Sequence, residues 1–213
     1  IFKTITMQEK KNKMKYIIVG AVAGGASTTA RLRRLDEHAE IVIFEKGAYI
    51  SYANCGLPYY IGNVITERNK LFVQTAASFN QRFNIDVRVQ TEVTGIDVAA
   101  KTITAKDLIT GKVYEERYDK LVLSPGAEPL RPPLPGINSE GIFTLRNVTD
   151  TDYIKSYVDN RKGGKAVIIG GGFIGLEMAE NLHHTGMQVT IIEMGNQVLA
   201  PVDRGNTEVV GGE

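Results

Sequence analysis

Short runs of apolar, mostly β-branched residues recur along the chain, and each predicts a buried strand. They lie at 16–19, 41–44, 121–123, 166–169 and 189–192. Between the first two runs, Ala26 to Leu35 shows helical spacing of apolar residues, and Leu176 to His184 does so between the last two. A continuous apolar strand followed by a helix and a second such strand is typical of a parallel βαβ unit. The pattern therefore predicts an α/β fold with two Rossmann-like units.

The middle of the chain alternates apolar and polar residues instead, as half-buried strands do. Four such stretches are predicted at 85–89, 92–98, 101–106 and 112–117. Thr110-Gly111 marks a turn before the last of them. We expect these strands to form an antiparallel excursion attached to the first parallel sheet.

Helices are also predicted at 78–84, with Ser78 as a possible N-cap, and at 149–160, with Thr149 or Asp150 near the cap. A proline-rich connector, Pro129 to Pro135, suits a crossing between two domains. We therefore expect a disordered tail at 1–13, a first domain at 14–148 and an incomplete second domain at 149–213.

A glycine-rich turn follows the first strand of each unit. The second turn, Gly170 to Gly175, satisfies G-x-G-x-x-G, whereas the first, Gly20 to Gly25, has Val22 in place of the usual middle glycine. Such turns let the backbone approach a pyrophosphate, which sits on the N–H groups of the following helix. Each unit thus predicts a dinucleotide site.

An acid ends the next strand of each unit, about 20 residues past the last glycine of the turn. These acids are Glu45 and Glu193, and each is placed to accept a hydrogen bond from a ribose hydroxyl. No Arg or Lys follows Glu193 closely to hold a 2′-phosphate, which favours NADH over NADPH.

Cys55 is the only cysteine, so an internal disulfide is excluded. It stands between the two glycine motifs, within the stretch Ser51 to Tyr60. A lone cysteine is most often a small buried apolar residue, and that alternative stays open here. We expect Cys55 to begin a helix, whose N-terminal dipole would favour the thiolate.

Composition narrows the class of partner. Lys and Arg number 25 against 24 Asp and Glu, so the net charge of +1 gives no footprint for nucleic acid. No apolar run approaches the roughly 20 residues of a membrane span, and no Cys/His cluster suggests a metal site. We expect a cytoplasmic protein without metal. His183 and His184 lack carboxylate partners along the chain and suit packing or surface roles.

The region from about Met14 to Asp203 resembles the flavin-dependent pyridine nucleotide-disulfide oxidoreductases. Within them it is most similar to the coenzyme A-disulfide reductases and their NADH oxidase and polysulfide reductase relatives. Four stretches carry the resemblance: 19–25, 51–62, 118–127 and 170–180. Val22 and Ser124-Pro125-Gly126-Ala127 are typical of this subgroup. The resemblance implies FAD and NADH or NADPH as cofactors, and a homodimeric parent enzyme.

The resemblance also implies roles for single residues. Cys55 would be the redox thiol beside the flavin, with Ser51 and Asn54 orienting its sulfur, and Glu177 would be the acid beside the flavin and nicotinamide rings. The residues expected at the cofactors are Gly20, Val22, Ala23, Gly24, Gly25, Glu45, Lys46, Ser124, Pro125, Gly126 and Ala127 for FAD, and Gly170, Gly172, Phe173, Ile174, Gly175 and Glu193 for NADH.

Three basic residues match positions near the coenzyme A nucleotide in the resembling enzymes. Arg31 and Arg34 lie at the end of the first helix together with Arg33, and Lys70 is a weaker match. The alternative is that the arginines are simply solvated, because cations are favourable near a helix C-terminus.

With one cysteine, oxidised Cys55 needs an external partner, which leaves three readings. In the first, Cys55 forms a mixed disulfide, and coenzyme A disulfide or a related small disulfide or polysulfide is reduced with NAD(P)H. In the second, an NADH oxidase or peroxidase cycles Cys55 through a sulfenic acid. The third is a catalytically silent nucleotide-binding fragment or redox-sensing module. The Asn54 to Pro58 context favours the first, whereas the longer chains of family members favour the third for this chain alone.

Overall fold

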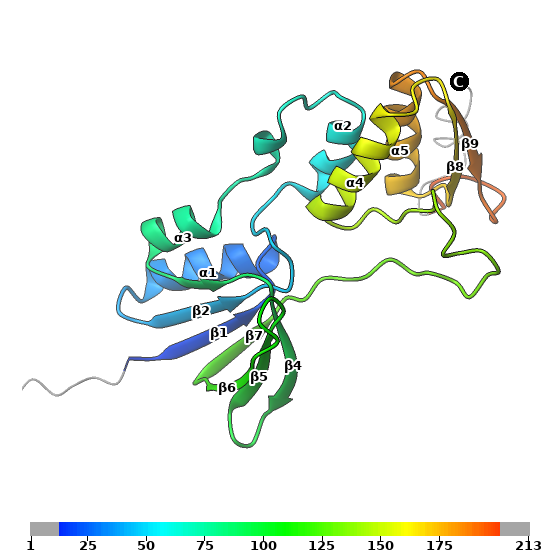
Figure 1. Cartoon of the computed structure of the whole chain (residues 1–213). Helices are drawn as coiled ribbons and strands as arrows, with labels where there is room; N and C mark the ends of the chain where they lie inside the picture. The colour runs from blue at the N-terminus through cyan, green and yellow to red at the C-terminus, as the bar shows by residue number, and fades with distance from the viewer. Residues whose placement is uncertain (1–12, 201–213) are drawn as a thin grey trace, which may run out of the picture. The chain divides into compact units, whose positions relative to one another are not determined.

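The computed structural model describes residues 13–200, which fall into two compact units (Figure 1). Within that range, unit 1 contains 13–52 and Gln74–Gly126, and unit 2 contains Ala53–Val73 and 127–200. The two nucleotide-binding domains expected at 14–148 and 149–213 stay a prediction. The tail expected at 1–13 lies outside the described residues except for Lys13, and so does the end of the chain after Ala200.

Unit 1 is built on a four-stranded parallel sheet in the order β3-β2-β1-β7. Its strands are β1 (Lys15–Val19), β2 (Glu40–Phe44), β3 (Asp86–Arg88) and β7 (Lys120–Leu123). Helix α1 (Gly24–Leu35) joins β1 to β2, which confirms the first βαβ unit. The strand predicted at 85–89 was assigned to the antiparallel excursion, and this is wrong: β3 pairs in parallel with β2. Tertiary packing decides which strand β3 pairs with, and the alternation of apolar and polar residues carries no information about that choice.

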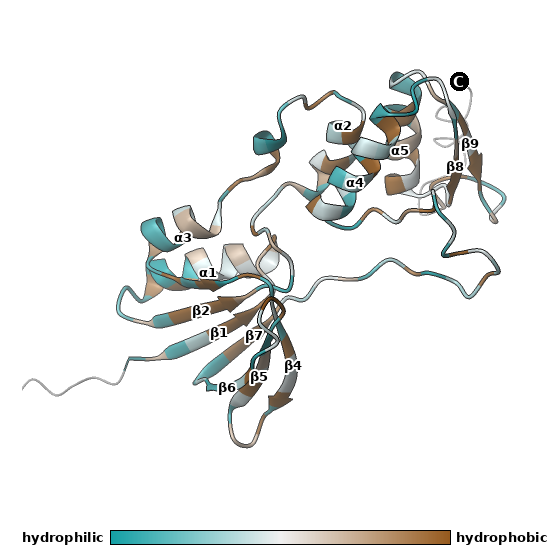
Figure 2. Ribbon diagram, in the orientation of Figure 1, coloured by the Kyte–Doolittle hydropathy of each residue, from teal (hydrophilic) through white to brown (hydrophobic). Residues whose placement is uncertain are grey.

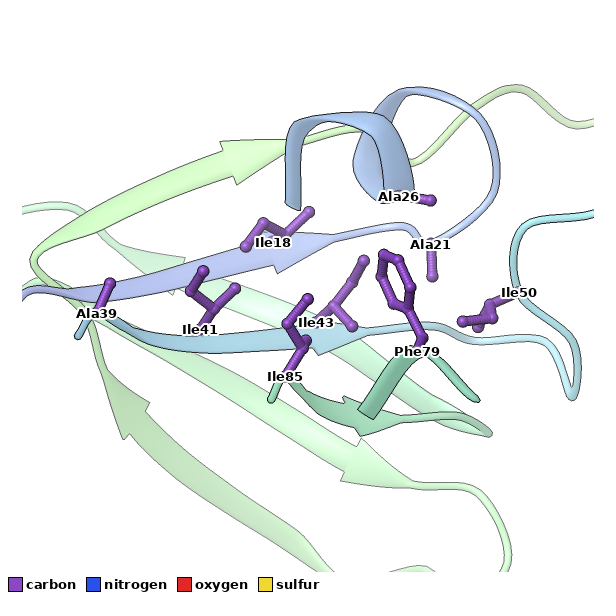
Figure 3. Close-up of a cluster of buried hydrophobic side chains, with 9 residues drawn as sticks. All are labelled: Ile18, Ala21, Ala26, Ala39, Ile41, Ile43, Ile50, Phe79 and Ile85. Atoms are coloured by element: carbon purple, nitrogen blue, oxygen red, sulfur yellow. The ribbon is translucent and has the colours of Figure 1, made fainter. Parts of the chain in front are cut away.

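Alternate residues of β1 and β2 serve two different cores. Ile18 and Ile43 face α1 and α3 (Ala76–Phe83), where Phe79 packs against them (Figure 3). Ile17 and Val42 belong to a second cluster on the other face, which packs against the antiparallel sheet. Both faces of the parallel sheet are therefore covered, as the uninterrupted apolar strands predict.

The antiparallel excursion is a three-stranded sheet in the order β4-β5-β6. Its strands are β4 (Thr91–Asp97), β5 (Thr102–Asp107) and β6 (Val113–Arg117). Gly111 lies in the turn before β6 with φ of +74°, a conformation that glycine adopts without strain. These elements confirm the later three of the four predicted strands.

A partly buried charge cluster joins this sheet to the parallel one. Glu116 on β6 accepts hydrogen bonds from Arg88 on β3 and, at 2.7 Å, from Nζ of Lys15 on β1. The Arg88 guanidinium also lies over the ring of Phe44. Burial alone would raise the pKa of Glu116, but the hydrogen bonds from Arg88 and Lys15 outweigh it and hold that pKa below its usual value. The glutamate is therefore bound as the carboxylate.

Unit 2 contains a parallel pair of strands, β8 (Lys165–Ile169) and β9 (Gln188–Ile192), joined by α5 (Phe173–His184). Helix α2 (Leu57–Ile61) packs against both α4 (Val148–Asp159) and α5. The strands are strongly apolar (Figure 2), and their outward residues Val167 and Ile169 are 61% and 80% exposed. The second βαβ unit is thus confirmed, and Gly186 ends α5 with φ of +87°.

Two helix starts differ from their predictions. Helix α3 is capped by Thr75, with Ser78 three residues inside, and α4 is capped by Asn147, with Asp150 three residues inside. Each pair forms a capping box, in which the side chain of each residue accepts a hydrogen bond from the backbone N–H of the other. A polar residue one turn into a helix looks like a cap in the sequence, which is why Ser78 was predicted at the cap itself, whereas Asp150 does lie near its cap as predicted. Within residues 13–200 no helix has the length and apolarity needed to cross a membrane.

Replacing Glu116 by Gln should lower the free energy of unfolding by about 1–3 kcal/mol at pH 7, because Arg88 and Lys15 lose a charged partner. A carboxylate whose folded pKa is lowered stabilises above its unfolded pKa of about 4.3 and loses that effect as pH falls through the folded value. The difference between wild type and E116Q should therefore shrink below about pH 4.

Urea unfolding across pH measures this difference. Glu115→Gln, at the exposed neighbouring position, is the control and should change little. An E116Q effect that is equal at pH 7 and pH 3 would contradict the assignment.

Candidate functional site

The first glycine turn brings three segments together at the ends of β1 and β7. Gly20 has φ of +94°, and a Cβ there would lie 2.0 Å from the carbonyl oxygen of Ser124. A Cβ on Gly25 would lie 1.7 Å from the carbonyl oxygen of Gly20. Both distances are impossible for a side chain, so glycine is required at each position. The start of α1 can then lie directly on the strand end, as a pyrophosphate-binding turn needs.

Gly24 explains why the first motif departs from G-x-G-x-x-G. A Cβ on Gly24 would lie 2.5 Å from Oγ of Ser124, the residue that opens the second predicted flavin-contacting stretch. The extra glycine and the serine, 100 residues apart in the chain, are therefore neighbours. Their contact was not predicted, because nothing local in either stretch signals it. Val22, at the usual glycine position, is half-buried.

The second glycine turn repeats this geometry within unit 2. Gly170 has φ of +105°, and a Cβ on Gly175 would lie 2.0 Å from the Gly170 carbonyl oxygen. A Cβ on Gly172, in contrast, would meet no atom within 4 Å. A Cβ on Gly170 would likewise meet no atom, so Gly170 serves the backbone conformation of the turn and Gly175 serves its packing, whereas Gly172 leaves open space beside the helix start.

Each predicted ribose-binding acid is fixed to its own glycine turn. Glu45 Oε2 accepts from the N–H of Ala21 at 2.8 Å, and its Oε1 accepts from Gly47 at 2.7 Å. Glu193 does the same, at 2.6 Å with Gly171 and 2.7 Å with Gly195.

The N–H groups of Gly195 and then Gly171 lower the pKa of Glu193. A carboxylate oxygen has two lone pairs, so each acid can still accept from a hydroxyl.

The helices that begin at these turns lack the caps found elsewhere. No side chain caps α1 or α5, whereas α3 and α4 have complete capping boxes. The first four N–H groups of a helix have no partner within it. With the glycine turn before it and the acid beside it, each uncapped start has the donors that a pyrophosphate requires. The residues present thus fit a dinucleotide in both units.

Cys55 lies in a 3₁₀ turn, η1 (Asn54–Gly56), and its side chain is exposed. The alternative of a buried apolar cysteine is therefore wrong. The helix expected to begin at Cys55 begins at Leu57 instead, with Pro58 in its first turn. The Gly56 N–H donates to the Ala53 carbonyl at 3.0 Å, which tightens the backbone at the cysteine into 3₁₀ geometry.

Ser51 has an unusual backbone conformation, with φ of +44°. Its N–H donates to the carbonyl of Ala21 at 2.9 Å, and its carbonyl accepts from Gln74 at 3.2 Å. Ser51 therefore ties the chain just before the cysteine turn to the first glycine turn. The left-handed conformation was not predicted, because serine carries no signal for it.

Glu177 lies on α5, in the same unit as Cys55, and is half-buried. Its carbonyl accepts from Nδ2 of the buried Asn181 at 2.8 Å. Lys46, predicted beside Glu45, is paired with Glu92 at 3.0 Å.

The predicted basic residues separate into three kinds. Arg33 donates to main-chain carbonyls of the α1–β2 connection and to those of Phe83 and Asn84 at the end of α3, so its role is structural. Arg31 and Arg34 are exposed, and neither has an ion pair among the described residues. Lys70 pairs with Glu67 at 2.7 Å within its own 3₁₀ turn, η2 (Arg68–Leu71).

Residues 14–212 match the family model described as pyridine nucleotide-disulphide oxidoreductase. The chain belongs to this family. Both predicted dinucleotide sites lie within the matched residues, and the family description names a pyridine nucleotide.

Curated members of the family with high similarity are coenzyme A disulfide reductases. The protein from Staphylococcus haemolyticus is 42% identical over 196 residues, which are 92% of this chain and 44% of that protein. The protein from Staphylococcus epidermidis is 43% identical over 190 residues, 89% and 43% of the two chains. The chain thus spans less than half the length of these relatives.

Solved structures of family members superpose closely. Reduced CoADR-RHD of Bacillus anthracis gives a TM-score of 0.91 with 53% identity, over 96% of this chain and 37% of that one. The NAD-dependent persulfide reductase of A. fulgidus gives 0.88 with 37% identity, over 93% and 37%. A water-forming NADH oxidase from Lactobacillus brevis, bound to NADH, gives 0.87 with 30% identity, over 94% and 44%.

Replacing Gly25 by Ala should destabilise unit 1 by at least about 2 kcal/mol, because the new methyl group meets a backbone carbonyl that cannot move aside. Urea unfolding measures the loss. Ser27→Ala, at an exposed position on the same helix, is the control and should stay within about 0.5 kcal/mol. Equal stability of the two variants would rule out the tight crossing of α1 over β1.

Proposed function

We propose that this chain is the cofactor-binding part of a cytoplasmic NADH-dependent coenzyme A-disulfide reductase that uses Cys55 as its single redox thiol. The observation that carries the proposal is the exposure of this one cysteine. It is exposed in a tight turn, and it stands in a chain 42% identical to a coenzyme A disulfide reductase. Glutathione-like or polysulfide substrates share the same sulfur–sulfur chemistry, and the assay below separates them.

The covalent chain supports a role for Cys55 near the first nucleotide site. Ser51 donates its N–H to Ala21 of the first glycine turn. The four residue-to-residue steps from Ser51 to Cys55 can span at most about 14 Å when fully extended. Chain connectivity alone therefore keeps the thiol within a short reach of the turn that fits FAD.

In the proposed reaction the Cys55 thiolate attacks one sulfur of coenzyme A disulfide. A Cys55–coenzyme A mixed disulfide forms, and the other coenzyme A leaves as a thiolate that takes up a proton. FAD and NADH, when bound, supply the two electrons that reduce the mixed disulfide. Cys55 then returns to the thiolate as the second coenzyme A is released. Overall, one disulfide, one NADH and one proton give two thiols and NAD⁺.

Other residues would orient the participants. Ser51 and Asn54 would hold the sulfur by hydrogen bonds, and Glu177 would border the flavin and nicotinamide rings. Arg31 and Arg34, exposed and without ion pairs in the described part of the chain, would bind coenzyme A phosphates. Lys70 would contribute less, because Glu67 already neutralises it. By resemblance, the working enzyme is a homodimer.

Cys55→Ser should retain the visible flavin spectrum and lose NADH oxidation driven by coenzyme A disulfide by at least about a thousandfold, because oxygen cannot replace the sulfur as nucleophile. The assay follows NADH loss and the appearance of two thiols per NADH. Replacing coenzyme A disulfide with glutathione disulfide or with polysulfide tests which disulfide the enzyme prefers. Measuring NADH loss without any disulfide tests the oxidase alternative. Retained turnover in Cys55→Ser would defeat the proposal.

Glu193→Ala combined with Met194→Arg should shift the preference from NADH toward NADPH by roughly 10–100-fold in kcat/KM. The variant removes a carboxylate that repels a 2′-phosphate and adds a cation beside it. Met194 is fully exposed, so the new arginine has room. Lys165→Gln, exposed on the neighbouring strand, serves as a control and should leave the ratio unchanged. No change in the ratio for the double variant would exclude Glu193 from the ribose site.

A further inference from the structure

Residues 53–73, here called the Cys55 lobe, form a closed loop of chain. The Ala53 N–H donates to the Leu71 carbonyl at 2.8 Å, so the two ends of the lobe meet. Between them lie the cysteine turn η1, helix α2 and the turn η2. The lobe belongs to unit 2, together with α4 and α5.

Apolar contacts seat the lobe on these two helices. Ile61, fully buried at the end of α2, packs with Ile154 of α4 and Met178 of α5. Gly62 follows, and a Cβ there would lie 2.4 Å from Oδ1 of Asn181 on α5. The lobe therefore lies against the helices without space for adjustment at this point.

Two charged side chains on one face of α4 also bind polar side chains of the lobe. Asp152 accepts from Nε and Nη2 of Arg68 at 2.7–3.0 Å, a two-pronged ion pair. One turn later, Lys155 donates to Oδ1 of Asn63 at 2.5 Å and lies 5.1 Å from the ring centre of Tyr60. Arg68 and Asn63 are on the lobe, so each contact joins the lobe to α4.

The charge of Asp152 affects the pKa of Tyr60, a residue of the lobe. Burial raises the pKa of the Tyr60 phenol, and the Asp152 carboxylate raises it further. Arg68, which acts in the opposite direction on Tyr60, is the partner that balances Asp152.

We propose, on the basis of the function proposed above, that Asp152 is a positioning residue for Cys55. Through its ion pair with Arg68 it fixes the orientation of the Cys55 lobe on α4, and hence that of the cysteine turn. The Lys155–Asn63 contact supports the same orientation.

The exposure of the pair agrees with positioning more than with stability. The side chains of Arg68 and Asp152 are 32% and 37% exposed, and ion pairs at that level add little to folding. Ile61 and Gly62 supply the burial that holds the lobe in place. A two-pronged guanidinium–carboxylate pair, in contrast, restricts direction as well as distance.

The test uses two readouts on the purified protein. A nitroxide label on Cys55, the only cysteine, reports the mobility of the lobe by its spectrum, and NADH oxidation with coenzyme A disulfide reports kcat and KM on unlabelled protein. Asp152→Asn should make the label more mobile and lower kcat about fivefold with KM unchanged, while the thermal midpoint changes little. Exchanging the pair, Arg68→Asp with Asp152→Arg, should restore both readouts.

Glu140→Gln is the matched control, because the Glu140–Arg161 pair lies in unit 2 outside the lobe, and this variant should leave both readouts at wild-type values. Unchanged label mobility in Asp152→Asn overturns the positioning role. A lower thermal midpoint with unchanged kcat would also overturn it, since the pair would then be structural only. If wild type oxidises no NADH with coenzyme A disulfide, the proposed function fails, and label mobility still decides whether Asp152 fixes the lobe.

Discussion

The steric constraint at Gly20 and Gly25 underlies everything proposed for unit 1. Neither residue can carry a Cβ, because the backbone carbonyls of Ser124 and Gly20 occupy the space where it would stand. Only this lets β1, α1 and β7 converge at one point of the sheet. The uncapped start of α1, the carboxylate of Glu45 and the serine stretch after β7 are brought to the same place by that convergence. Unit 2 relies on the same close approach between Gly170 and Gly175.

Both units hold their glycine turn in the same way, but with different residues. In each, an acid after the second strand holds the glycine turn by a backbone N–H, through Ala21 in unit 1 and Gly171 in unit 2. The units differ at the middle of the turn, where Val22 is half-buried and Gly172 faces open space. Unit 1 instead places its additional glycine, Gly24, against Ser124.

Local patterns were enough to predict the strands, both glycine turns and both acids, because these depend on period, glycine and short spacing. The predicted burial is confirmed for β1 and β2 and is wrong for β7, β8 and β9, which contain no fully buried residue. Contacts between distant segments could not be predicted in the same way. The parallel pairing of β3, the Gly24–Ser124 contact and the seating of the Cys55 lobe on α4 and α5 are set by tertiary packing. Helix starts could be predicted only to within about one turn, since Thr75 and Asn147 share their capping boxes with polar residues three positions later. The exposure of Cys55 could not be predicted from composition either.

The carboxylates that hold the glycine turns have a thermodynamic consequence for nucleotide recognition. Each turn is braced entirely by protein atoms, with one carboxylate oxygen on the loop and the other on the residue two positions beyond the acid. An incoming dinucleotide therefore meets a preorganised surface, and little conformational entropy is lost in shaping it. Association should then be governed by diffusion and charge, and the residence time of the nucleotide by the contacts it gains after docking.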